Sequence, residues 1–117
     1  MSTPQYIYKV ADATAFARAQ AAGTFEGAPI DLRDGFMHFS TAAQLAETIR
    51  LHFRGRHDLV LAAVRTAALG DRLRWEPSRG GALFPHLYGP LELSAVAWVE
   101  GIDVDEDGNC QLPARLG

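Results

Sequence analysis

The pattern of apolar and polar positions predicts several strands in this chain. The run Leu59–Val64 is apolar throughout and too short for a buried helix, so it is typical of a central strand covered on both faces. A short apolar strand at Phe36–Phe39 follows the turn residues Asp34-Gly35. Three further segments alternate with a period of two, as half-buried strands do: Tyr6–Val10, Arg72–Glu76 and Val96–Glu100.

Two short helices are predicted from capping residues and helical spacing. Asp12 is a suitable N-cap for an alanine-rich helix that ends at Gly23. Thr41, followed three residues later by Gln44, forms a capping-box pattern at the start of a second helix, which Gly55 ends. The second helix carries the following side chains on one face: Leu45, Ile49, His52 and Phe53.

The remaining segments are predicted as loops and turns. Residues 25–33 and Pro77–Pro90 are expected to be irregular, and Thr66–Leu69 a single helical turn. Asp107-Gly108 is a hairpin signal between the last strand and Cys110–Leu112. These elements predict an α+β fold in one compact domain over residues 1–117, mostly of antiparallel strands, with a C-terminal hairpin and tail at 100–117.

Charge and composition narrow the classes of function. The 117 residues carry 11 Lys and Arg against 14 Asp and Glu, a net charge of −3 that argues against a general nucleic-acid binder but not against a small phosphate-bearing ligand. The single cysteine, Cys110, allows no intrachain disulfide, and no apolar run approaches the roughly 20 residues of a membrane span. No signal peptide is visible, so we expect a cytoplasmic protein without membrane contact; the oligomeric state is not predicted.

His38 is the strongest candidate for chemistry. It ends an apolar strand two residues before the second helix, beside backbone N–H groups that favour anions. Ser40 lies on the same side of the strand and adds a hydroxyl, with Thr41 next to it. The alternative is a buried, hydrogen-bonded histidine with Ser40 as a plain capping or turn residue, and the residues alone favour neither.

The segment Pro77–Pro90 holds the second candidates. Loops of this length in a small domain are usually functional or disordered, and its aromatic side chains argue against disorder. The length therefore favours function over an aromatic loop that merely covers the edge of the core. His86 and Tyr88 are spaced to reach one ligand, with Phe84 nearby. Glu76 and Arg79 fit either the polar mouth of a ligand site or a solvated ion pair. Arg33-Asp34 is expected at the surface.

No metal site is predicted. The four histidines show no His-Glu-x-x-His or paired-cysteine spacing. Asp103 to Gly108 matches the start of an EF-hand loop, but the twelfth position is Ala114 where the ion needs a bidentate glutamate.

Three motifs together resemble the bacterial domain-of-unknown-function 952 family. They are Tyr8-Lys9, Asp34–Thr41 and Phe84–Leu91, and the resemblance runs from about Tyr6 to Val99. The two longer motifs, in this order and spacing, are specific to the family. It has no established activity, and its fold has been grouped with the ADP-ribosyltransferase-like folds, which include the RNA 2′-phosphotransferases.

This resemblance implies roles for individual residues. His38 matches the strand histidine that holds the nicotinamide-side ribose of NAD in such folds, and Tyr88 the aromatic that stacks on nicotinamide. His86 is implied as a ribose or phosphate contact, and Ser40 as a weaker one. Many active members supply a late glutamate, but neither Glu92 nor Glu100 lies in a motif that matches.

Three functions therefore stay open. The first is an ADP-ribosyltransferase-like domain that binds NAD, as substrate rather than resident cofactor, or another nucleotide-like ligand, with ADP-ribosyl or phosphoryl transfer. The second is a module that binds the same ligand, or a partner, without turnover. The third is a two-histidine phosphoesterase, for which His38-Phe39-Ser40 fits the expected His-x-Ser/Thr and His86-Leu87-Tyr88 does not.

Overall fold

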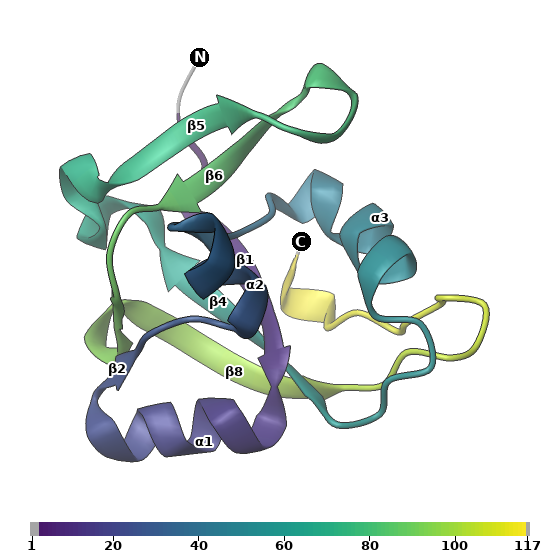
Figure 1. The fold of residues 1–117 in the computed structure, drawn as a ribbon. Helices are drawn as coiled ribbons and strands as arrows, with labels where there is room; N and C mark the ends of the chain where they lie inside the picture. The colour runs from purple at the N-terminus through teal and green to yellow at the C-terminus, as the bar shows by residue number, and fades with distance from the viewer. Residues whose placement is uncertain (1–2, 117) are drawn as a thin grey trace.

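The central sheet joins three antiparallel strands in the order β1 (Tyr6–Asp12), β4 (Leu59–Arg65) and β8 (Val96–Ile102) (Figure 1). The computed structural model describes residues 3–116, apart from the side chain of Arg79. The apolar run at Leu59–Val64 is the middle strand, as predicted, and an apolar cluster packs on each face of its sheet. A register shift between Ala63 and Val64 bends its pairing with β8.

A second antiparallel sheet, in the order β3-β6-β5, carries most of the candidate residues. Its strands are β3 (Met37–His38), β6 (Leu83–Leu87) and β5 (Leu73–Pro77), and β5 and β6 form the hairpin at the top of Figure 1. The prediction of an irregular segment at Pro77–Pro90 is therefore wrong. Its glycines and prolines mark only the hairpin turn, with the 3₁₀ turn η3 at Arg79–Gly81, and the end of β6. Pro85 fits inside this middle strand and still contributes its carbonyl, which accepts the N–H of Phe39 at 3.0 Å.

Residues 3–116 contain three α-helices rather than the two predicted: α1 (Ala13–Ala22), α2 (Pro29–Asp34) and α3 (Ala42–His52). The Asp12 carboxylate caps α1 by accepting the N–H of Ala15 at 2.8 Å, as the sequence predicts. Thr41 and Gln44 form the predicted capping box of α3, but α3 ends at His52, with Phe53 as its C-cap. His52 is exposed instead of packed with its neighbours.

The helix that the sequence did not reveal is α2, placed where a loop was predicted. It begins with Pro29, whose missing N–H costs nothing at a first helical position, and ends at Gly35, whose φ of 84° favours glycine. Its burial is the reverse of an ordinary surface helix: Asp31 is buried, whereas Leu32 is 65% exposed. An apolar pattern therefore could not reveal it. In Figure 1, α2 lies between the β5–β6 hairpin and β8.

The two faces of the central sheet carry two apolar clusters, and β1 shows the alternation that separates them. Ile7 and Ala11 face the cluster that includes α1 and the second sheet, whereas Tyr8 and Val10 face α3 and the C-terminal segment. The second sheet thus packs its inner face, with Met37 and Leu87, on the core and leaves its outer face for other contacts.

Short elements complete the fold. The two-residue strands β2 (Thr24–Phe25) and β7 (Leu91–Glu92) pair with each other, and a turn forms at Asp107-Gly108, but the strand predicted at Cys110–Leu112 is absent from the described part of the chain. Cys110 and Leu112 instead pack beside the α3 cluster without a sheet partner. No helix in the described range 3–116 has the length and apolarity needed to span a membrane. The remaining 3₁₀ turns are η1 (Thr66–Ala68), η2 (Gly70–Arg72), η4 (Leu93–Ala95) and η5 (Ala114–Leu116).

Candidate functional site

The two motif histidines lie opposite each other on neighbouring strands. His38 of β3 pairs in register with His86 of β6, and their ring centroids are 5.5 Å apart with the planes at 69°. Arg74 of β5 is the next residue in the same row, facing His86. Residues directly opposite in a sheet share a face, so these side chains project from the outer face of the second sheet. The sheet thereby joins two motifs that are distant in sequence.

Phe36 is the contact that unites the candidate residues. Its ring stacks on His86 with centroids 4.2 Å apart, and its centroid lies 4.8 Å from that of His38 and 5.4 Å from that of Tyr88. We call Phe36, His38, Glu76, His86 and Tyr88 the histidine cluster. Phe36 and His38 are half-buried and Tyr88 is 38% exposed, so the histidine cluster reaches the surface.

Both ring nitrogens of His38 face carboxylates of α2. Nδ1 lies 2.6 Å from Oδ1 of Asp31, and Nε2 lies 3.0 Å from Oδ2 of Asp34. A protonated ring nitrogen donates its N–H to a carboxylate oxygen, so each of these two contacts restrains the ring from one side. Helix α2 therefore fixes the orientation of this imidazole.

Asp31 is buried and accepts four hydrogen bonds, two on each oxygen. Oδ1 also takes the backbone N–H of His38 at 3.1 Å, and Oδ2 takes Nζ of Lys9 and the N–H of Ala28, each at 2.8 Å. Burial by itself raises the pKa of a carboxyl, but the His38 hydrogen bond and the Lys9 charge outweigh it and hold the pKa of Asp31 at about 2. Burial lowers the pKa of Lys9, against the opposing attraction of Asp31.

Glu76 links His86 to Tyr88. Its Oε1 lies 2.8 Å from Nδ1 of His86 and accepts the Tyr88 hydroxyl at 2.8 Å. The hydrogen bonds from His86 and then Tyr88 lower the pKa of Glu76, and the same carboxylate raises the pKa of the Tyr88 phenol. The Arg74 guanidinium lies over the Tyr88 ring, 5.4 Å from its centroid. His86, only 5% exposed, is thus a buried support for the more exposed rings.

The other residues singled out in the sequence are placed differently. The Ser40 hydroxyl is buried and lies 2.9 Å from that of Thr48 on α3, and Thr41 caps the same helix. Phe84 is buried in β6. The side chain of Arg79 lies outside the described residues. The structure therefore brings His38, His86, Tyr88 and Glu76 together and assigns Ser40 and Thr41 contacts with α3.

The two late glutamates lie on other elements. Glu92 of β7 accepts the Thr24 hydroxyl at 3.3 Å, and Glu100 of β8 forms an ion pair with Arg115. The carboxylates that do reach the histidine cluster are Glu76, Asp31 and Asp34. The sequence did not single out Asp31, which lies outside the motifs of the family resemblance. Its partner Lys9 and the second carboxylate, Asp34, both lie inside those motifs.

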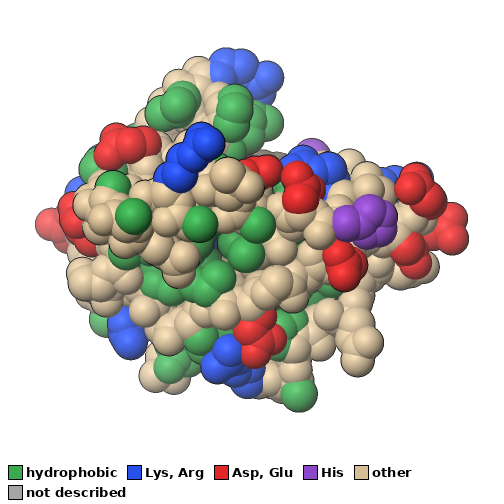
Figure 2. Space-filling view, turned by 90° about the horizontal axis from the view of Figure 1, so that it is seen from below, with side chains coloured by type: hydrophobic (Ala, Val, Ile, Leu, Met, Phe, Trp, Pro, Cys, Tyr) green, Lys and Arg blue, Asp and Glu red, His purple; other side chains and the backbone are tan. Residues whose placement is uncertain are grey.

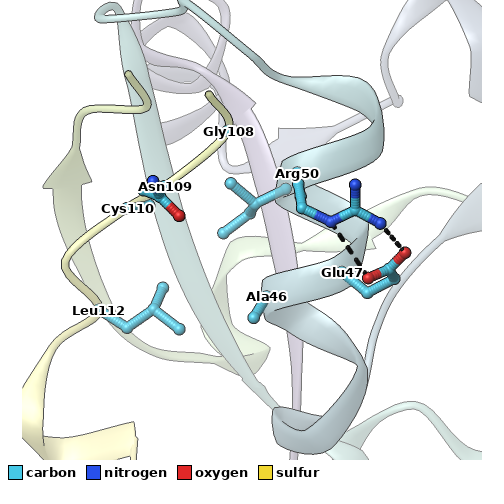
Figure 3. Close-up of a pocket in the computed structure, with 8 residues that line it drawn as sticks. Ala46, Glu47, Arg50, Gly108, Asn109, Cys110 and Leu112 are labelled. Carbon is cyan, nitrogen blue, oxygen red and sulfur yellow. Dashed lines mark hydrogen bonds and ion pairs between the residues drawn. The ribbon is translucent and has the colours of Figure 1, made fainter. Parts of the chain in front are cut away.

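A pocket of about 220 Å³ lies elsewhere, between α3 and the C-terminal segment (Figure 3). It is lined by Ala46, Glu47, Ile49, Arg50, Gly108, Asn109, Cys110 and Leu112, none of which belongs to the histidine cluster. Within residues 3–116, no three metal-ligating side chains are grouped to hold a metal ion. Figure 2 shows acidic and basic side chains interspersed on the face seen from below, without an extended basic surface there.

Comparison with known proteins identifies related chains. The family model described as Protein of unknown function (DUF952) matches residues 10–99. The crystal structure of protein CC0527 from Caulobacter crescentus is 48% identical, with a TM-score of 0.89 over 95% of this chain and 97% of that chain. The solution NMR structure of the same protein is 48% identical, with a TM-score of 0.79 over 90% of each chain. No curated protein matches the chain.

Proposed function

The chain belongs to the DUF952 family of proteins of unknown function, and we propose that its histidine cluster binds NAD or another small ligand that carries an ADP-ribose or phosphate group. The observation that carries the proposal is the convergence of His38, His86 and Tyr88 around Phe36. Histidine and glutamate side chains add little to the stability of a fold when they merely cover its surface. Sites that use them for binding place them together on rigid elements. The ADP-ribosyltransferase-like grouping of the fold is part of the same proposal.

The aromatic rings that reach the surface, one half-buried and one exposed, suit a flat heterocycle. Phe36 and Tyr88 offer ring surface at the edge of the histidine cluster, and aromatic pairs prefer offset or tilted contacts of the kind that they already make with each other. The carboxylate of Glu76, held beside Tyr88, favours a ring that carries positive charge, as oxidised nicotinamide does.

The polar groups suit the rest of such a ligand. The His38 imidazole is 33% exposed, and its Nε2 suits a ribose hydroxyl or a phosphate oxygen once the Asp34 carboxylate that it faces moves away. The exposed guanidinium of Arg74 lies on the same sheet face and suits a phosphate. One small surface thus presents donors, an acceptor and stacking rings.

Binding without turnover is the form of this function that the geometry favours. Transfer from NAD requires a carboxylate that stabilises positive charge at the ribose, and Glu76 is the nearest to Tyr88. Its Oε1 is already engaged by both His86 and Tyr88. Incubation with NAD and chromatography of released nicotinamide separates the two forms: product formed by the wild type and lost in Glu76→Gln establishes transfer.

The two-histidine phosphoesterase is less well supported. Such an enzyme needs one free imidazole as base and one as acid, on either side of a phosphate. Here both nitrogens of His38 face carboxylates, and His86 is buried beneath Phe36.

Calorimetric titration with NAD and ADP-ribose tests the binding proposal. We expect saturable binding to the wild type, and binding weaker by about tenfold in Phe36→Ala, equal to roughly 1.4 kcal/mol of lost ring contact. His57→Ala is the matched control, because His57 is exposed and paired with Asp103 away from the histidine cluster. An absence of binding to the wild type, or equal losses in the two variants, would contradict the proposal.

A further inference from the structure

We propose that Arg33 and His38 form an anion-binding clamp that the chain fills with its own Asp34 carboxylate until a phosphate group of a ligand replaces it. The inference deepens the proposed function and rests on it for the location of the ligand. It names the group that the ligand must bring, a phosphate, and the internal contact that this group must displace.

The geometry of the clamp is that of a bound anion. Nε of Arg33 donates to Oδ1 of Asp34 at 3.0 Å, and Nε2 of His38 lies 3.0 Å from Oδ2. Each oxygen of one carboxylate thus faces a different basic side chain. Two oxygens of a phosphate present the same pair of acceptors with more negative charge, so the clamp suits a phosphate at least as well.

The two carboxylates around His38 differ in whether they can leave. Asp31 is fixed, because its side chain is 2% exposed and both of its oxygens have two donors. Asp34 is 29% exposed and has one partner on each oxygen. Exposed ion pairs of this kind contribute little to stability, so exchange of Asp34 for another anion costs the fold little. Asp31 therefore stays in contact with Nδ1 of His38, whereas the anion at Nε2 can be exchanged.

The position of Asp34 also allows it to leave the clamp. It is the last residue of α2 and precedes Gly35, whose positive φ ends the helix. Rotation of its side chain into solvent breaks no backbone hydrogen bond. The pKa of Asp34 is lowered, first by the Arg33 hydrogen bond and further by His38, so the clamp holds the ionised form.

Titration with inorganic pyrophosphate, followed by the imidazole NMR resonances of His38, tests the clamp. Removal of the internal competitor in Asp34→Ala should tighten pyrophosphate binding by about fivefold relative to the wild type. Asp107→Ala is the matched control, because it removes the same charge from the exposed C-terminal turn. Arg33→Gln combined with Asp34→Ala should lose most of the gain.

Four outcomes decide the matter. Tighter binding in Asp34→Ala than in Asp107→Ala, with His38 resonances moving, supports the clamp, and Asp34→Asn should then give a smaller gain in the same direction. Equal affinities, no binding to Asp34→Ala, or binding that leaves His38 unmoved overturns it. Urea unfolding of each variant confirms that α2 is intact.

The clamp and the proposed function can fail separately. If NAD does not bind the wild type while pyrophosphate still binds Asp34→Ala more tightly, the proposed function fails and the clamp stands. If NAD binds but pyrophosphate shows no such preference, the clamp fails and the proposed function stands.

Discussion

Nδ1 of His38 lies 2.6 Å from Oδ1 of Asp31, which joins the candidate site to the interior of the protein. The same carboxylate binds Lys9 of the central sheet through its other oxygen, at 2.8 Å. The imidazole of a surface site is therefore anchored through a buried ion pair to β1. This anchoring makes the site a rigid one, and several of its properties can be measured without knowledge of the ligand.

Asp31→Asn should lower the free energy of unfolding by about 3 kcal/mol, because it leaves Lys9 buried without its counter-charge. An amide also presents a donor group to the N–H of Ala28 or to Lys9, both of which donate to Asp31. Urea unfolding followed by circular dichroism measures the change. Asp71→Asn, on an exposed 3₁₀ turn, is the control and should stay within about 0.5 kcal/mol of the wild type. Equal stabilities of the two variants would show that the buried pair contributes nothing.

Lowering the pH should destabilise the protein over a pH range that is set by the pKa of Asp31. Its pKa is about 2 in the folded chain, below the ordinary value of 3.8 that the unfolded chain should keep. The carboxylate therefore contributes stability above about pH 5 and loses it progressively as the pH falls towards 2, by about 2 kcal/mol in all. The difference between the wild type and Asp31→Asn should shrink between pH 6 and about pH 3. A difference that stays constant over this range would refute the assignment.

Glu76→Gln should lower the pKa of the Tyr88 phenol. The carboxylate raises this pKa in two ways, by accepting the phenol hydrogen bond and by repelling the phenolate. Titration of ¹³Cζ-labelled tyrosine by NMR reports the change, and Glu92→Gln, on β7, should leave Tyr88 as it is in the wild type. An unchanged Tyr88 titration in Glu76→Gln would mean that the 2.8 Å hydrogen bond does not form in solution.

Gly35→Ala should destabilise the protein by about 1 kcal/mol, because an alanine is strained at a φ of 84°. Apart from the adjoining residues, no atom lies within 4 Å of the added Cβ, so the cost is one of backbone conformation. Gly101→Ala is the matched control: it also has open space, but it lies in β8 without a positive φ. We expect that control to stay within about 0.5 kcal/mol of the wild type. Similar unfolding midpoints for the two variants would contradict the described end of α2.

The sequence predicts those parts of the fold whose signal is local. The capping box at Thr41 and the N-cap at Asp12 need only residues that are three positions away. The run Leu59–Val64 indicates a central strand by itself, and the structure buries five of its six apolar residues, with Val60 partly buried. These elements therefore appear where the pattern places them.

The parts that were missed depend on partners from elsewhere in the chain. Helix α2 is stabilised through Asp31 by Lys9, 22 residues earlier, and its apolar side chains are exposed, so periodicity misreads it. Strand β6 contains Pro85, and turn residues stand on both sides of it. Pairing with β3 and β5 makes it a strand, and neither partner is visible locally.

The sequence predicts only part of the candidate site, because some of its candidates contact α3 instead and one central ring is missed. His38, His86 and Tyr88 were chosen from chemistry and spacing, and the structure brings them together. Phe36 was assigned only to a strand, although it contacts all three rings. The loop-length argument that favoured function in Pro77–Pro90 does not hold, since part of that segment is a strand. We therefore infer a functional site from the geometry of the histidine cluster and not from the length of a loop.

NMR titration of the wild-type protein with NAD tests the central claim most directly. We expect saturable shifts in the resonances of His38, Phe36 and Tyr88, together with shifts at Asp34, whose carboxylate faces Nε2 of His38. Resonances of Cys110, in the pocket beside α3, should not move. If these ring resonances stay unchanged at millimolar NAD, or if the shifts are confined to the surroundings of Cys110, the histidine cluster is not the binding site and the account is wrong.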